Sequence, residues 1–138
     1  MIKKLFITGC VLGIIGAVFG YYTFNKPHKS ASDAAADFTM SAKELFTAFE
    51  TDETNSNQKY IGKLVEVSGT VIGTANSGFS KSVTLNADAM MGGVVFELDS
   101  AYAATLQALP DSGKVVKLKG FCNGYLSDVE LNRAVIVE

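Results

Sequence analysis

Histidine and cysteine, which supply much of the nucleophilic and metal chemistry of proteins, are almost absent from this sequence of 138 residues. The single histidine is His28, and the only cysteines are Cys10 and Cys122. The region after residue 30 therefore has no imidazole base for a serine or cysteine nucleophile, and no histidine-based metal site. Two cysteines are also too few for a disulfide-stapled mini-protein. We expect no enzymatic activity, no metal site and no cofactor.

Basic residues are scarce after residue 29, where the chain carries eight of them against fourteen acidic residues, for a net charge of −6. The whole-chain charge of −2 hides this split, because four lysines lie before residue 30. Nucleic-acid affinity comes largely from Lys and Arg contacts to phosphate, so an acidic region argues against a nucleic-acid partner. At this length the chain holds one domain at most, which excludes a multidomain enzyme.

One stretch is long, apolar and uncharged: the 20 residues from Leu5 to Phe24. It accounts for a mean hydropathy of +0.22, which is high for a small soluble protein. As a helix rising about 1.5 Å per residue it would measure about 30 Å, the thickness of a bilayer core. Tyr21 and Tyr22 lie near its end, where aromatic belts form. We predict that residues 1–24 are a signal anchor, a single transmembrane helix in the inner (cytoplasmic) membrane.

Two other interpretations of this stretch compete with the anchor. Val18-Phe19-Gly20 is a weak cleavage site for a removable signal peptide. Ile7-Thr8-Gly9-Cys10 has the form of a lipobox, but only two residues separate it from the preceding lysines and the apolar stretch continues beyond it, so we treat this motif as a chance match. Lysines lie on both sides of the stretch, so the positive-inside rule barely decides the orientation. The short N-terminus and the signal-like order favour a domain in the periplasm.

Residues 25–40 are predicted to be a linker and residues 41–138 a folded domain. A capping box at Ser41-Ala-Lys-Glu44 predicts a helix over 42–50, and a second short helix ends near Tyr60. Apolar alternation then predicts five strands, with a helix over 100–109 between the third and the fourth. This is the chain order of an OB-fold barrel. The predicted fold is mainly β with α, a five-stranded OB-fold barrel with an N-terminal helical extension.

The last two strands are predicted to join at Asn123-Gly124, a strong signal for a two-residue hairpin turn. Such a turn pairs Cys122 with Tyr125 and, farther back, Leu118 with Val129. The apolar residues of both strands then share one face, which supports this register. Cys122 falls on that face, so we expect a buried structural thiol.

Three motifs follow one another in the predicted domain. They are Leu45-x-x-Ala48-Phe49-Glu50 leading into Asn55-x-Asn57-x-Lys59-Tyr60-x-Gly62-Lys63, then Val67-x-Gly69-x-Val71, and finally Gly120-x-Cys122-x-Gly124-x-x-x-Asp128-Val129-x-Leu131. In this order, over about residues 41–137, the chain resembles the tRNA-anti-like family of small bacterial OB-fold proteins, often carried behind a signal or lipoprotein leader. The resemblance implies that fold and an envelope location. It implies no established activity and therefore no catalytic residue.

Candidate ligand-binding residues lie in the loops that OB-folds use for recognition. The loop over 73–82 carries Phe79 and Lys81, and Tyr125 lies beside the predicted last turn. An exposed Phe79 could stack on a ligand ring. The alternatives are that Phe79 folds back over a barrel end and that Tyr125 packs across from Cys122.

An acidic cluster follows the first predicted helix of the domain, at Glu50, Asp52 and Glu53. Carboxylates of this kind could hold a weakly bound cation. They are also typical of helix caps and helix termini, and we favour that interpretation.

We therefore expect a non-catalytic, membrane-anchored OB-fold module. Its domain would lie outside the cytoplasm and bind a protein, a peptide or a small ligand. One alternative is an OB-fold protein that binds single-stranded nucleic acid. Another is a periplasmic envelope-stress protein whose barrel has no chemistry of its own.

Overall fold

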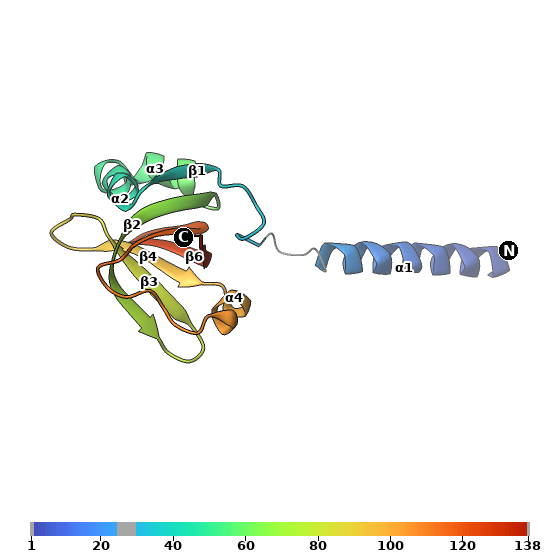
Figure 1. Ribbon diagram of the computed structural model, residues 1–138. Helices are drawn as coiled ribbons and strands as arrows, with labels where there is room; N and C mark the ends of the chain where they lie inside the picture. Colours follow the sequence, from blue (N-terminus) through green and yellow to red (C-terminus); the bar gives the residue numbers. More distant parts are fainter. Residues whose placement is uncertain (1, 25–29, 138) are drawn as a thin grey trace.

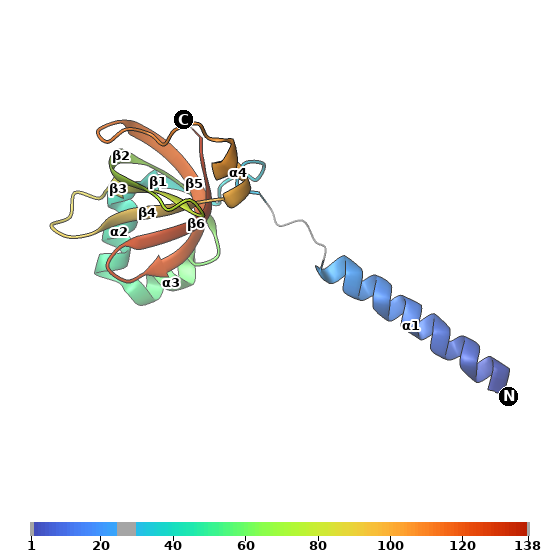
Figure 2. The same cartoon turned by 90° about the horizontal axis from the view of Figure 1, so that it is seen from below.

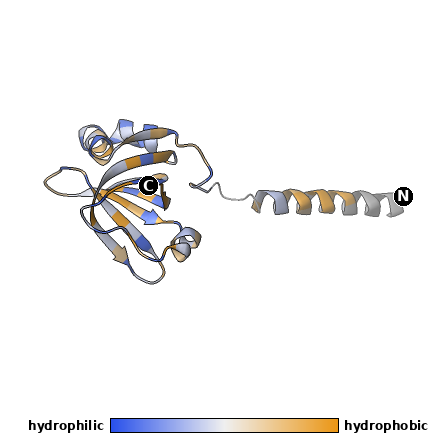
Figure 3. Ribbon diagram, in the orientation of Figure 1, coloured by the Kyte–Doolittle hydropathy of each residue, from blue (hydrophilic) through white to orange (hydrophobic). Residues whose placement is uncertain are grey.

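The computed structural model describes residues 2–24 and 30–137, except for the side chains of residues 2–8 and 10. Helix α1 runs from Ile2 to Phe24. Its described apolar side chains are exposed, and Figure 3 shows them as orange bands along the helix. Among the described residues, no helix has both the length and the hydropathy that crossing a membrane requires. The predicted membrane anchor stays a prediction, and residues 25–29 of the predicted linker lie outside the described residues.

The rest of the described chain is a closed barrel with helices at its ends (Figure 1). The strands run in the sheet order β1-β2-β3-β4-β6-β5, and pairing of β2 with β5 closes the ring. The strands are β1 (Phe38–Ser41), β2 (Leu64–Asn76), β3 (Lys81–Asn86), β4 (Gly93–Leu98), β5 (Val115–Tyr125) and β6 (Val129–Ile136), and the helices are α2 (Ala42–Thr51), α3 (Glu53–Tyr60) and α4 (Ser100–Thr105).

Strands β2 to β6 form the five-stranded barrel that the sequence predicts. Strand β4 pairs with β6 in parallel, and the other pairings around the ring are antiparallel. Helix α4 lies between β4 and β5 in the chain, which is the OB-fold order. The predicted fold class is therefore confirmed for the barrel and its N-terminal helices.

Helix α2 closes one end of the barrel with its apolar face. Leu45, Phe46 and Phe49 are all buried, and each such side chain contributes about 1.5–3 kcal/mol through burial. Gly69 on β2 allows the helix to come close, since a Cβ at this position would lie only 3.1 Å from the Cβ of Ala42. Figures 1 and 2 show α2 and α3 together along this end of the barrel.

The capping interactions of both helices agree with the prediction. The Ser41 hydroxyl accepts from the Glu44 amide at 3.2 Å, and the Glu44 carboxylate accepts from the Ser41 amide at 2.7 Å. The Ser41 amide, and after it the Ser41 hydroxyl at 2.9 Å, donate to the Glu44 carboxylate and hold its pKa below the ordinary value. Asp52 caps α3 by accepting from the Asn55 amide at 3.0 Å. This acidic residue is therefore a helix cap, as we favoured.

Strand β1 was not predicted. It runs parallel to β2, with Phe38 opposite Val65 and Ser41 opposite Ser68. The same stretch of β2 pairs with β5 on its other edge, whereas β3 pairs with β2 only from Val71 onward. Strand β1 therefore covers the part of this edge that β3 does not reach.

The hairpin between β5 and β6 differs from its predicted register. Tyr125 pairs with Val129, so the turn comprises residues 126–128. Cys122 pairs with Leu131, six residues beyond its predicted partner, whereas Leu118 pairs with Ile136, seven residues beyond its own. The even shift at Cys122 leaves that residue opposite an apolar partner, so the apolar pattern there cannot separate the two registers. The odd shift at Leu118 is accommodated by the irregularity between Lys119 and Phe121.

Asn123 and Gly124 form part of β5 and make no turn. The ladder is irregular at this point, and Asn123 is the extra residue of a β-bulge. The turn is built around Asp128, whose carbonyl accepts from the Leu126 amide at 3.1 Å. Its carboxylate accepts from the Gly93 amide at 2.7 Å, which ties the turn to the start of β4.

Helix α4 is shorter than predicted and ends at Thr105. The carbonyl of Ala103 accepts from the Leu106 amide at 3.3 Å and from the Lys81 ammonium at 2.7 Å. These partners occupy the acceptor that a further turn of helix would need. The remaining residues before Pro110 are therefore outside the helix.

Candidate functional site

Phe79 lies at the tip of the turn between β2 and β3 and is 98% exposed. The Ser77 amide donates to the Ser80 carbonyl at 3.0 Å, and the Gly78 amide donates to Oδ1 of Asn76 at 3.1 Å. Gly78 has a φ of 81°, which glycine adopts without strain. Phe79 therefore does not fold back over the barrel end, and its ring faces solvent.

Lys81 begins β3, and its ammonium group points toward α4. Nζ donates to the carbonyl of Ala103 at 2.7 Å and to that of Leu106 at 3.2 Å. Carbonyls at a helix C-terminus lack partners within the helix and favour a positive charge. Lys81 therefore holds α4 against the start of β3, and its charge is engaged by these carbonyls.

Tyr125 ends β5 beneath α2. Its ring stacks on Phe49, with centroids 5.9 Å apart and an interplanar angle of 27°. It also meets the ring of Phe46 edge-on, at 5.7 Å and 82°. In Figure 1, α2 lies at the end of the barrel away from the turn that carries Phe79. The structure does not bring the three predicted residues together, and Tyr125 packs against the core.

A groove opens on the outer face of β3, β4 and β6, next to the turn that carries Phe79. Its volume is about 280 Å³. The pairing that builds it places Ser82 opposite Glu97 and Val95 opposite Glu130. Its polar lining comprises Ser80, Ser82, Glu97, Asn123, Glu130 and Asn132. This is the sheet face, with its adjoining loops, that OB-folds use for binding.

The groove is rich in hydrogen-bond acceptors. Glu97 and Glu130 are exposed. The ion pairs between described residues join Lys43 to Asp88 and Lys114 to Asp111, so neither groove carboxylate takes part in them.

One groove acceptor is buried. Oδ1 of Asn132 has no hydrogen-bond partner within the described part of the chain. An unsatisfied buried acceptor of this kind costs about 1–3 kcal/mol, so a donor that reaches this oxygen would be favoured.

The sequence profile of the tRNA_anti-like family matches residues 1–136, nearly the whole chain. The chain belongs to the tRNA_anti-like family. Among solved structures, this family member is similar to a "putative nucleic acid-binding lipoprotein" from Klebsiella pneumoniae subsp. pneumoniae. The TM-score is 0.58 at 18% identity, covering 82% of this chain and 100% of that one, which supports the shared fold. No curated protein matches the sequence.

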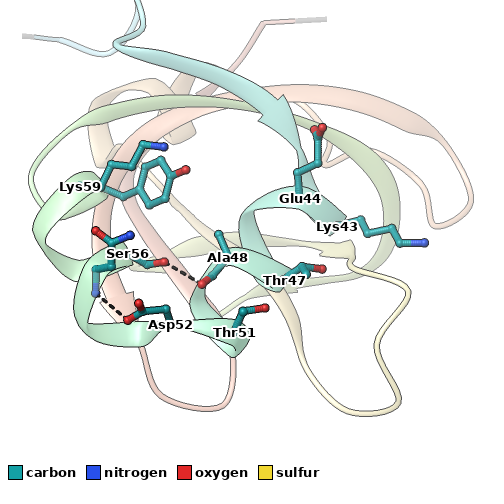
Figure 4. Close-up of a pocket in the computed structure, with 10 residues that line it drawn as sticks. Lys43, Glu44, Thr47, Ala48, Thr51, Asp52, Ser56 and Lys59 are labelled. Carbon is teal, nitrogen blue, oxygen red and sulfur yellow. Dashed lines mark hydrogen bonds between the residues drawn. The ribbon is translucent and has the colours of Figure 1, made fainter.

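A second hollow, of about 560 Å³, lies between α2 and α3 of this tRNA_anti-like domain (Figure 4). The polar groups around it bind one another. The Ser56 hydroxyl donates to the Ala48 carbonyl at 2.7 Å, and Asp52 caps α3. The Lys59 ammonium lies 5.1 Å from the centroid of the Tyr60 ring. These contacts hold the two helices together, and no described trio of His, Cys, Asp or Glu is arranged to bind a metal.

The Cys122 side chain lies in the core of the barrel. Burial raises the pKa of its thiol to about 11, although the Gly124 backbone partly opposes this shift. A thiol that stays protonated at neutral pH is a poor nucleophile. The predicted buried structural role of Cys122 in this family member is confirmed.

Sequence reasoning missed the groove residues Glu97, Glu130 and Asn132. An outward carboxylate next to a buried apolar residue on each of two strands is a usable signal, since the neighbouring Phe96 and Leu131 are buried. The two carboxylates come together only because β4 pairs with β6, which follows α4 and β5 in the chain. In a tRNA_anti-like sequence, the two carboxylates can be assigned to one surface only when this non-local pairing is known.

Proposed function

We propose that this protein is a membrane-tethered, non-catalytic binding module of the cell envelope. Its OB-fold domain would lie outside the cytoplasm and present the groove on β3, β4 and β6 to a protein, peptide or small-molecule partner. The observation that carries this proposal is the groove itself, on the binding face of the fold beside an aromatic ring that is 98% exposed. Exposed aromatic side chains are frequent anchors in binding surfaces.

The proposed tether is the N-terminal helix. The stretch from Leu5 to Phe24 carries no charge. The described apolar residues of α1 are exposed, so they have no protein core to pack against. The Klebsiella pneumoniae relative is described as a lipoprotein, which supports an envelope location for this chain as well.

A non-catalytic role is supported by the residues near the groove. Its polar lining consists of serine, asparagine and glutamate side chains, without histidine or cysteine. The thiol of Cys122 points into the core and stays protonated at neutral pH. Neither a nucleophile–base pair nor a histidine-based metal site is available to this surface.

Single-stranded nucleic acid is a second candidate partner. It is supported by the description of the Klebsiella pneumoniae relative as nucleic acid-binding. Glu97 and Glu130 argue against it, because they would place negative charge beside phosphate.

Crosslinking in membranes tests the binding role. A photoreactive phenylalanine at Ser82 samples the groove, and the same residue at Glu50, on the exposed side of α2, is the matched control. We expect the Ser82 probe to yield a discrete crosslinked partner that Phe79→Ala weakens and that the Glu50 probe does not capture. Identical crosslinks from both positions would refute the groove as the binding surface.

The tether needs its own experiment. Protease digestion of spheroplasts should remove the domain while leaving cytoplasmic proteins intact. Mass analysis of the mature N-terminus then distinguishes an intact anchor from cleavage near Gly20 or lipidation at Cys10. Protection of the domain in spheroplasts, followed by digestion after lysis, would contradict the proposed location.

A further inference from the structure

The chemistry of the groove narrows the class of ligand. We propose that the groove on β3, β4 and β6 binds a ligand through a cationic hydrogen-bond donor, a guanidinium or ammonium group. This inference rests on the proposed binding role of the same surface. It identifies the ligand by the charge and the hydrogen bonds that the lining can satisfy.

The two carboxylates of the groove are placed to share one cation. Glu130 lies opposite Val95, and Glu97 is the next outward residue along β4. The carboxylates are therefore diagonal neighbours on the same outer face. None of the eight lining residues is basic, so the lining itself offers no countercharge.

One further atom of the lining favours a donor. Oδ1 of Asn132 is buried without a hydrogen-bond partner among the described residues. A guanidinium group offers five N–H donors and an ammonium group three, and neither accepts hydrogen bonds. A phosphodiester group, by contrast, offers only acceptors, and its negative charge would be repelled by the two carboxylates.

The end of the groove completes this environment. Phe79 is adjacent to the lining residue Ser80 and presents an exposed aromatic face, which attracts cations. The nearest lysine in the chain, Lys81, has its ammonium bonded to the carbonyls that follow α4. Its positive charge is therefore engaged away from this surface.

The size of the groove also limits the ligand. Its volume of about 280 Å³ lies at the small end of ligand pockets, which commonly span about 300–1,000 Å³. It suits one side chain or a small amine better than a nucleotide. The source of the cation is then a basic peptide or a free polyamine, and the experiment below separates the two.

We would titrate the full chain in detergent micelles, following backbone amide NMR signals. One probe is a heptapeptide with two arginines, and its matched control carries citrulline, which is uncharged and nearly isosteric, in place of each arginine. We expect shifts confined to the groove strands and a Kd about tenfold higher for the citrulline peptide, because exposed ion pairs and cation–π contacts are individually weak. The double variant Glu97→Gln with Glu130→Gln should bind the arginine peptide about tenfold more weakly, whereas Glu50→Gln should bind it as the parent chain does.

Spermidine is the second probe, at the same ionic strength. Stronger binding of the arginine peptide than of spermidine identifies a peptide source, and the reverse order identifies a polyamine source. Equal binding of the arginine and citrulline peptides would overturn the cation assignment. The cation assignment would also be overturned if a thymidine oligomer shifted the same amides and bound more tightly to the double variant.

Failure of this inference is distinguishable from failure of the proposed function. If the Ser82 probe captures a partner in membranes but charge has no effect on peptide binding, the binding role stands and the cation assignment is refuted. If the Ser82 probe captures nothing and neither peptide nor spermidine shifts the groove amides, both are refuted.

Discussion

Gly92 offers a sharp test of how the loop before β4 is held against the β5–β6 turn. Its φ is 89°, and a Cβ at this position would lie 2.3 Å from the carbonyl oxygen of Ser127 and 3.1 Å from the Phe46 ring. The Gly92→Ala change therefore adds a left-handed backbone penalty of about 1–2 kcal/mol and overpacking of about 1–3 kcal/mol. The sum is a loss of about 2–5 kcal/mol in the free energy of unfolding.

Two glycines separate these contributions. Gly78 has a φ of 81° but open space around its Cβ position, so Gly78→Ala should cost only the backbone penalty. Gly73 lies in β2 with open space and without a left-handed φ, so Gly73→Ala should be neutral or slightly stabilising. Urea unfolding of the full chain can be followed by tyrosine fluorescence, since the sequence has no tryptophan. A Gly92→Ala variant as stable as Gly78→Ala would refute the contact with Ser127 as the reason for glycine.

Three further predictions concern Cys122, Tyr125 and Lys81. Burial raises the pKa of Cys122 from 9.0 to about 11, so its alkylation at pH 8 should be about 100-fold slower than that of a free thiol. Rapid labelling of the folded protein would contradict a buried, protonated Cys122. Because the folded state raises this pKa, burial of the protonated thiol contributes its full share to the free energy of unfolding below pH 9. That share is lost as the pH rises toward 11, which urea unfolding at pH 8 and 10.5 would measure. Tyr125→Ala should cost about 2–4 kcal/mol by removing the ring beneath α2, whereas Tyr125→Phe, which keeps the stacked ring, should cost far less in the same assay. Lys81→Met should lower the free energy of unfolding by about 1–2 kcal/mol and speed amide exchange in α4, because the carbonyls that follow this helix lose their donor. Crosslinking from Ser82 should not change. Reduced crosslinking with unchanged stability would indicate a ligand-facing lysine instead.

Local patterns in the sequence predict the elements of this domain well. The capping box at Ser41 predicts the start of α2, because both of its hydrogen bonds join residues three apart. The alternation of Val65 and Val67 predicts the buried face of β2, because one side of that strand faces the core. Signals of this kind need no knowledge of the rest of the fold.

Pairing between distant segments is what the sequence does not determine. The partner of Cys122 moved by six residues, an even shift that an apolar pattern with a period of two accepts. The partner of Leu118 moved by seven, because the ladder is irregular between the two positions. Strand β1 was missed because four residues beginning at Phe38 are too few to show a period. The need for a further strand along this edge of β2 is evident only once β3 is known to begin pairing at Val71.

The candidate site shows the same limit. The glycine- and serine-rich turn around Phe79 suggested an exposed ring, but the sequence left open that the ring folds back over the barrel end. Lys81 seemed equally available, but its partner Ala103 lies 22 residues along the chain. Tyr125 finds Phe49 across an even longer separation, through the docking of α2. A loop position alone therefore could not tell a binding residue from a structural one.

Strand β1 also determines where the domain can be shortened. Asp37 anchors the start of this strand, donating its amide to the Leu64 carbonyl at 2.7 Å and accepting from the Leu64 amide at 2.9 Å through its carboxylate. A fragment that begins at Ser41 would leave one edge of β2 with free backbone donors and acceptors, a template for pairing with another molecule. A fragment that begins at Ser30 keeps that edge covered and retains Ala31, which is buried against Leu64. The smallest monomeric form of this domain therefore starts upstream of Asp37, within the stretch that sequence alone assigns to the linker.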